Sequence, residues 1–295
     1  MSGTAGARPV VVGVDGSPAA DRALRWAAGE AILRGAPLLV VAALHGPGAG
    51  ELTGVLTDAA VAHRAASSQR LAAAAEVARS LGVVELRTDL HPGPAVAALL
   101  AHAHEALMVV VGSKGLAERS GGLAHSVSTA VTAHARCPVV VVSGAVPSGA
   151  DRGPVVVGVD GSPTSGQAVE LAFVEAELRD VGLVAVHAWT DLDLAAVYAL
   201  DGYAVQLDPA LLQTAHAGVL AHALADPAAR HPGVTVREVV VEDRPVRTLL
   251  AESADAQLLV VGSHGRGGFA SMLLGSTSRA LLHAAECPVV VVRAR

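Results

Sequence analysis

Short apolar runs alternate along this chain with longer segments in which apolar residues recur every three or four positions. The runs at 38–44 and 183–189 are almost entirely aliphatic and have the length of buried strands. The segments 57–81 and 209–229 have the alanine-rich spacing of long helices with one apolar face. Strands that are apolar throughout need cover on both faces, so the pattern predicts parallel β-sheets with helices on both sides.

The chain contains this pattern twice. Residues 10–18, VVVGVDGSP, recur unchanged as residues 155–163, and the Cys-Pro pair before four valines at 137–142 recurs at 287–292. An ordered set of matches about 150 residues apart indicates a duplicated domain. We therefore predict a first domain over residues 1–144, a linker over 145–154 and a second domain over 155–295.

Within each copy, strands and helices are predicted to alternate. Ser17-Pro18 and Ser162-Pro163 are typical of helix starts, because serine caps a helix and proline fits its first turn. Third strands are expected at 83–90 and 234–241, each followed past a proline by another helix. Residues 191–208 have no counterpart in the first copy and are predicted to form either a surface insertion or a lid.

Composition and charge exclude several functions. The net charge is −6, no basic run is present and 2% of the residues are aromatic, so we expect no nucleic-acid partner. The apolar runs reach about six residues, far short of the ~20 that a membrane helix needs, so we expect no membrane partner. The start is too short and polar for a signal peptide, which predicts a cytoplasmic protein. Cys137 and Cys287 occupy equivalent places before strands, which indicates buried structural residues rather than a disulfide or metal site.

The stretch 262–276, GSHGRGGFASMLLGS, carries the strongest chemical signal. It follows the apolar run 258–261 and leads into helical spacing over 277–286. Glycines and free backbone N–H groups at the start of a helix suit a phosphate group. The loop has no lysine, so backbone amides and hydroxyls would hold the phosphate with help from Arg266. The pattern G-x-G-x-x-A at 265–270 also fits a dinucleotide site, but it follows the fourth strand of its domain instead of the first, which disfavours that interpretation.

These features resemble the universal stress protein family in its tandem form, and the resemblance covers nearly the whole chain. The family's nucleotide motif is Gly, two residues, Gly, nine residues, Gly, then Ser or Thr, and it is matched by Gly262, Gly265, Gly275 and Ser276. The resemblance implies two Rossmann-like α/β domains, each a five-stranded parallel sheet of order 3-2-1-4-5 with helices on both faces. It also implies ATP binding and a role in stress response or dormancy.

The resemblance places ATP, with Mg²⁺ as a further candidate, at the carboxyl ends of the first and fourth strands of each domain. Asp160 is expected to bind the nucleotide through a hydroxyl, an amino group or Mg²⁺, Val186 to touch adenine, and the loop to wrap the ribose and phosphates. The expected binding residues of the second domain are Gly158, Asp160, Val186, Gly262, Ser263, His264, Gly265, Arg266, Gly267, Gly268, Gly275, Ser276 and Thr277. Those of the first domain are Gly13, Asp15, Val41, Gly112, Gly115, Ser126 and Val127.

The first domain departs from the motif, and we predict that it binds ATP more weakly. His125 replaces the third glycine, where we expect its Cβ to strain a backbone that favours glycine and its ring to take the place of a phosphate. Leu116 replaces Arg266, and Glu118 adds a negative charge to a loop meant for an anion. The opposing interpretation is that protonated His125 beside Lys114 attracts phosphate and compensates.

The other reactive residue types form no recognisable site. His102 and His104 are two apart on a predicted helix and point to different faces, and His216 and His222 are six apart, so no metal site is predicted. The chain has no G-x-S-x-G sequence, which leaves a covalent hydrolase unsupported.

The sequence thus favours an ATP-binding, nucleotide-sensing regulator with an unidentified protein partner. The alternatives are a slow ATPase or nucleotidyl-transfer enzyme using the same loop, and an interaction module whose nucleotide is structural. No general base near a γ-phosphate can be named, so we assign no catalytic residue and expect a slow ATPase at most. The valines at 139–142 and 289–292 are expected to pair the two domains as an intramolecular pseudo-dimer, because exposed apolar edge strands aggregate. A further homodimer stays open.

Overall fold

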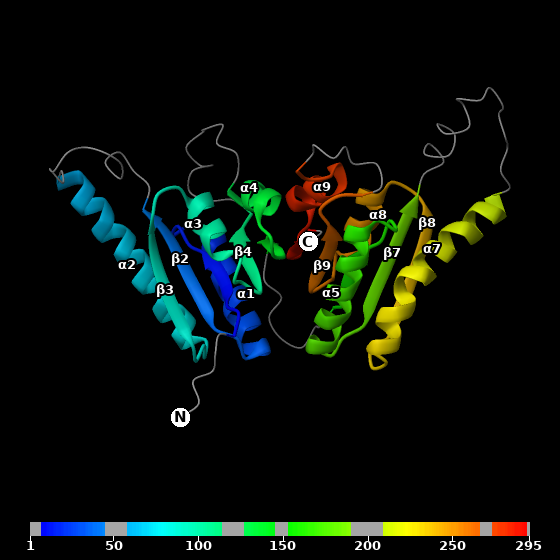
Figure 1. Cartoon of the computed structure of the whole chain (residues 1–295), viewed down its shortest axis with the longest axis horizontal. Coiled ribbons are helices and arrows are strands. Elements are labelled where there is room, and N and C mark those ends of the chain that lie inside the picture. The colour runs from blue at the N-terminus through cyan, green and yellow to red at the C-terminus, as the bar shows by residue number, and fades with distance from the viewer. Residues whose placement is uncertain are drawn as a thin grey trace, which may run out of the picture. The chain divides into compact units, whose positions relative to one another are not determined.

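A computed structural model describes residues 7–44, 58–113, 127–144, 153–189, 209–265 and 273–293 of the chain (Figure 1). The chain divides into two compact units, Met1–Val146 and Pro147–Ala294. No helix among the described residues is both long enough and apolar enough to cross a membrane.

The first unit alternates strands and helices along the chain (Figure 1). Its described elements are β1 (Val10–Gly13), α1 (Pro18–Arg34), β2 (Leu38–Leu44), α2 (Asp58–Ser80), β3 (Leu86–Pro92), α3 (Ala95–His102), β4 (Met108–Gly112), α4 (Val127–His134) and β5 (Val139–Val142). The strands are parallel and lie in the order β3-β2-β1-β4-β5. This order is the predicted one.

The second unit repeats the arrangement. Its described elements are β6 (Val155–Gly158), α5 (Pro163–Arg179), β7 (Leu183–Trp189), α7 (Pro209–Arg230), β8 (Val236–Glu242), α8 (Pro245–Glu252), β9 (Leu258–Gly262), α9 (Ser276–Ala284) and β10 (Val289–Val292). Its parallel strands lie in the order β8-β7-β6-β9-β10. The predicted α/β class and strand order are therefore confirmed in both units.

Helices cover both faces of each sheet. In the first unit, α1 and α2 contact each other and one face, while α3 and α4 contact each other and the opposite face. In the second unit, α5 and α7 form one layer, and α8 and α9 form the other. The central strands are buried between these layers, which explains why their sequences are apolar throughout.

The helix starts follow the predicted chemistry. Ser17 Oγ accepts a hydrogen bond from the Ala20 N–H at 3.1 Å, and Ser162 Oγ accepts one from the Ser165 N–H at 3.2 Å. In each helix the following proline occupies the first turn, where its missing N–H costs nothing.

The predicted start of the third strand is wrong by three residues, because Val83 lies in the turn that follows α2 and β3 begins at Leu86. Gly82 adopts a left-handed φ of 98°, and the Val83 N–H donates to the Ala78 carbonyl at 3.2 Å. This hydrogen bond closes the last turn of the helix. The buried Val83 resembles the first residue of a strand in sequence, but its N–H is bonded to the last turn of α2.

Burial controls the chemistry of the two free cysteines. Cys137 and Cys287 are each 4% exposed, and burial raises the pKa of each thiol to about 11. At pH 8 a pKa of about 11 leaves about one thiol in a thousand ionised, and the thiolate is the reactive form. We expect an aromatic disulfide reagent to modify the thiols of the native chain slowly at pH 8. After unfolding in urea, both thiols should be modified rapidly. Fast modification of the native chain would contradict this account.

Candidate functional site

The loops that follow β6 and β9 meet at one edge of the second sheet. The two strands are parallel neighbours, with Val155 beside Leu258 and Val157 beside Val260. After β6 the chain crosses to β7 on one side, and after β9 it crosses to β10 on the other. Open α/β sheets bind ligands where adjacent connections part in this way.

Asp160 and Gly265 are in close contact across this point. A Cβ added to Gly265 would lie 2.4 Å from Asp160 Oδ2, so the carboxylate lies directly against the glycine backbone. The φ of Gly265 lies outside the left-handed region. Glycine is therefore required here for close approach and not for its backbone conformation.

The other oxygen of Asp160 has a structural task. Asp160 Oδ1 accepts a hydrogen bond from the Ser162 N–H at 2.9 Å, and Asp15 Oδ1 accepts the equivalent bond from Ser17 in the first unit at the same distance. Each carboxylate thus stabilises the turn that leads into α5 or α1. Asp160 is half-buried and fixed in orientation at this turn.

The first glycine of the motif serves packing. A Cβ on Gly262 would lie 2.9 Å from Thr164 Oγ1 and 3.0 Å from the Thr164 carbonyl carbon, in the first turn of α5. In the first unit a Cβ on Gly112 would lie 2.7 Å from the Ala19 carbonyl carbon and oxygen. The expected contact of Gly262 with ribose or phosphate remains a prediction, whereas its contact with α5 is direct.

Thr164 is a residue of this site that the sequence reasoning missed. Its Oγ1 donates a hydrogen bond to the His264 carbonyl, and Ser162 Oγ approaches the same oxygen at 3.4 Å. These bonds tie the loop after β9 to the start of α5. A hydroxyl one residue after the helix-starting proline was the available signal, and Ala19 stands at the equivalent place in the first unit.

Helix α9 begins close to this edge with its amides uncapped by side chains. Gly275 is the N-cap, and no side chain of the described residues caps the helix. The Gly275 N–H and the Ser278 hydroxyl both donate to the Ser263 carbonyl, at 2.7 and 3.1 Å. These bonds hold the start of the helix beside β9, where Ser276 is exposed and Thr277 is half-buried. Backbone amides in such a position suit an anion.

The third glycine of the motif has an ordinary backbone conformation in the second unit. Gly275 has a φ of −67°, which any residue adopts, so its conformation gives no support to the left-handed strain that was expected at the equivalent His125. A Cβ there would lie 3.3 Å from the Ser263 carbonyl oxygen, which is tight but needs only a small shift. His125 itself lies outside the described residues, as do Lys114, Gly115, Leu116, Glu118, Ser126, Arg266, Gly267 and Gly268.

The remaining expected residues lie on the strands or at helix ends. Val186 pairs with Gly158 and Val41 pairs with Gly13, and both valine side chains are buried. Their expected contact with adenine remains a prediction. The expected residues Ser263, His264 and Val127 lie at the ends of elements: Ser263 is buried, its Oγ is 3.0 Å from His264 Nδ1, and Val127 begins α4.

Three further polar contacts near these loops were not predicted. In the first unit Arg70, from α2, donates to the Asp15 carbonyl at 3.2 Å. In the second unit His187 Nδ1 lies 2.7 Å from the Val159 carbonyl oxygen, and its Nε2 lies 2.9 Å from His216 Nδ1. The spacing of His216 predicted no site, but its ring also stacks on Trp189 with ring centroids 4.3 Å apart. Contacts between distant elements give no signal in local spacing.

Known proteins share this sequence and architecture. Residues 6–143 and 152–293 each match the universal stress protein family. Universal stress protein Rv2005c of Mycobacterium tuberculosis is 43% identical over 294 residues, which cover 96% of each chain, and Rv2623 of the same species is 38% identical over 96% of each chain. A crystal structure of a universal stress protein from Archaeoglobus fulgidus superposes with a TM-score of 0.68 at 18% identity, covering 97% of this chain and 96% of that one.

Proposed function

The chain belongs to the universal stress protein family, and from this premise we propose that its second unit binds ATP between the ends of β6 and β9. The observation that carries the proposal is the contact of Asp160 with the backbone of Gly265, beside the uncapped start of α9. It brings a fixed carboxylate close to a helix start that no side chain of the described residues caps, at the sheet edge where α/β proteins bind ligands.

Different described residues would bind different parts of the nucleotide, according to their chemistry. The amides at the start of α9 and the hydroxyls of Ser276 and Thr277 would hold phosphate oxygens. Asp160 would accept a hydrogen bond from a ribose hydroxyl or share Mg²⁺ with the phosphates, since Mg²⁺ in proteins commonly combines one carboxylate with phosphate oxygens. We assign no catalytic residue, and propose that bound ATP is a signal read by a regulatory protein partner.

Mass spectrometry of nucleotide released by denaturing the freshly purified protein tests this proposal. We expect an adenine nucleotide at close to one per chain in the wild type. Asp160→Asn should reduce the amount, because it removes the negative charge and keeps the oxygen that accepts from Ser162. Asp15→Asn is the matched control in the first unit and should leave the amount nearly unchanged. A wild type without nucleotide, or equal losses in both variants, would contradict the proposal.

A further inference from the structure

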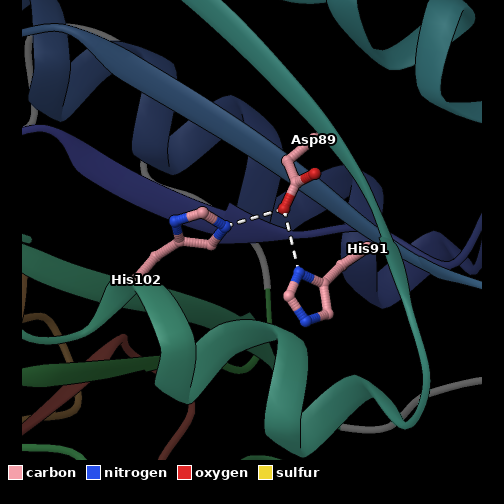
Figure 2. Close-up of side chains that lie close together, drawn as sticks. All are labelled: Asp89, His91 and His102. Carbon is pink, nitrogen blue, oxygen red and sulfur yellow. Dashed lines mark hydrogen bonds and ion pairs between the residues drawn. The ribbon is translucent and has the colours of Figure 1, made fainter.

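Three metal-ligating side chains converge in the first unit, on the strand farthest from β5. Asp89 and His91 belong to β3, and His102 is the last residue of α3 (Figure 2). Asp89 Oδ2 lies 2.7 Å from His102 Nε2 and 3.2 Å from His91 Nδ1. All three ligand atoms lie within 4.8 Å of one another, and each side chain is about 30% exposed.

The fold explains why these residues meet. Asp89 and His91 are two apart on a strand, so their side chains share one face. Helix α3 packs on β1 and β2, and its last residue therefore comes to lie near the neighbouring β3. The spacing of His102 and His104 along one helix predicted no metal site, whereas the partner of His102 is Asp89 on the preceding strand.

We propose that Asp89, His91 and His102 bind one divalent transition-metal ion of the zinc type. Imidazole and carboxylate are common protein ligands of Zn²⁺, and three protein ligands leave a fourth position for water. Ligand atoms 2.0–2.2 Å from a tetrahedral ion are separated by roughly 3.3 Å. The observed separation of 3.2 Å is close to this value, and the separation of 2.7 Å must widen by about 0.6 Å to admit the ion.

A change of histidine tautomer would free the ring nitrogens of the cluster to bind a metal ion. His91 Nδ1 and His102 Nε2 each lie within hydrogen-bond distance of the shared carboxylate oxygen, which can accept an N–H from either ring (Figure 2). A neutral imidazole that carries its proton on the other ring nitrogen presents a lone pair at the same place. Both rings are partly exposed, so water can accept a hydrogen bond from the N–H at the other ring nitrogen. The carboxyl end of α3, where His102 lies, also favours a positive charge.

The second unit does not repeat these three residues. We therefore expect the chain to bind one metal ion at a site of this kind. Val239, Val241 and Glu252 stand at the positions equivalent to Asp89, His91 and His102. Glu252 instead accepts a hydrogen bond from Arg237 at 2.5 Å. The two units therefore differ in the ligand set at this sheet edge. The first unit offers a carboxylate and two imidazoles, and the second offers one carboxylate that already pairs with an arginine.

The experiment is calorimetric titration of the chelator-treated full chain with Zn²⁺, supported by absorption spectra with Co²⁺. We expect one Zn²⁺ per chain and Co²⁺ bands typical of nitrogen and oxygen ligands. His91→Val and Asp89→Val each place the residue of the second unit at the equivalent position, which favours correct folding. Each should weaken Zn²⁺ binding by roughly a hundredfold or more, since loss of even an outer-shell partner costs 10–100-fold.

His104→Ala is the matched control, because His104 is exposed and lies two residues from His102 without belonging to the cluster. It should leave the affinity and the Co²⁺ spectrum unchanged. Circular dichroism of the metal-free variants separates loss of a ligand from loss of the fold. Equal binding by the wild type and the two valine variants would overturn the proposal, as would the absence of binding to the wild type, which would make the cluster a hydrogen-bonded link between β3 and α3.

Discussion

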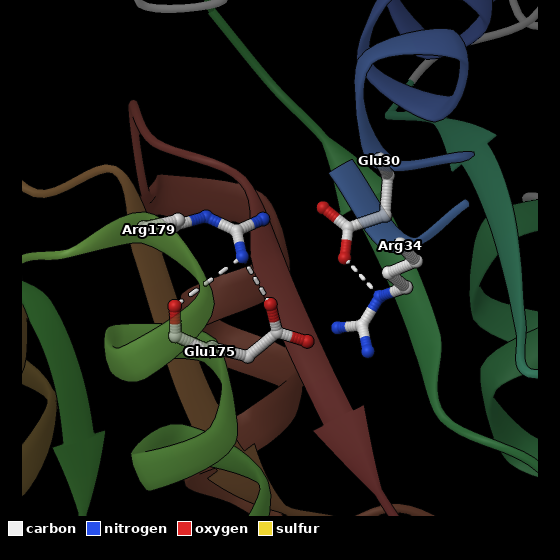
Figure 3. A network of polar contacts seen from close by, with 4 residues as sticks. All are labelled: Glu30, Arg34, Glu175 and Arg179. Atoms are coloured by element: carbon white, nitrogen blue, oxygen red, sulfur yellow. Dashed lines mark hydrogen bonds and ion pairs between the residues drawn. The ribbon is translucent and has the colours of Figure 1, made fainter. Parts of the chain in front are cut away.

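Replacing Glu175 with alanine is expected to lower the free energy of unfolding by about 3–5 kcal/mol, because it removes a buried carboxylate that binds a nearly buried arginine. The Glu175 side chain is fully buried in α5, and the Arg179 side chain one turn later is 10% exposed. The arginine Nη1 donates to the glutamate carboxylate and lies 3.5 Å from its backbone oxygen (Figure 3). Helix α1 carries the equivalent pair, in which Arg34 Nε lies 2.5 Å from Glu30 Oε1 (Figure 3).

Urea-induced unfolding followed by circular dichroism measures this effect. Glu170→Ala is the matched control, since Glu170 lies on the same helix and pairs with Arg230 at an exposed site. Water already solvates both members of that pair, so its loss should change the unfolding free energy little. Equal and small effects of the two substitutions would show that the buried pair does not stabilise α5.

Replacing Gly265 with alanine is expected to weaken ATP binding about five- to a hundredfold, which corresponds to about 1–3 kcal/mol. The added Cβ would lie 2.4 Å from Asp160 Oδ2, so either the carboxylate or the loop must move. Asp160 is held at the turn by its other oxygen, which accepts from the Ser162 N–H. The displacement therefore changes the relative positions of the carboxylate and the loop, which are the two parts proposed to hold the nucleotide.

Calorimetric titration with ATP measures this change, and Gly166→Ala provides the control. Gly166 lies in α5 of the same unit, and a Cβ added there meets no atom within 4 Å. Alanine favours a helix over glycine, so this variant should fold at least as stably and bind ATP like the wild type. An unchanged ATP affinity in Gly265→Ala would show that the contact of Gly265 with Asp160 does not contribute to ATP binding.

Features coded by neighbouring residues were predictable from the sequence. Ser17 and Ser162 start helices because a hydroxyl and a proline act within one turn, and the apolar runs form strands because both faces of the sheet are covered. The duplication located equivalent positions without any structure. The strand order came from the resemblance to a family, because periodicity does not determine which strands are neighbours.

Features that depend on distant residues were not predictable in this way. The left-handed φ of Gly82 places Val83 in the turn that follows α2, where the sequence predicted the start of a strand, and the φ of Gly275 shows that this glycine is not needed for a left-handed conformation. The cluster of Asp89, His91 and His102 exists only because α3 ends beside β3. Spacing along the chain records none of these relations, since they are set by how the layers pack.

The number of tight ATP sites per chain tests the central claim most directly, because only the second unit keeps the full motif. Isothermal titration of the nucleotide-free wild type should give close to one tight site per chain, and that site should be weakened by Gly265→Ala and retained in Gly115→Ala. Two equal tight sites, no site, or a tight site that survives Gly265→Ala but not Gly115→Ala would contradict the assignment of ATP to the second unit.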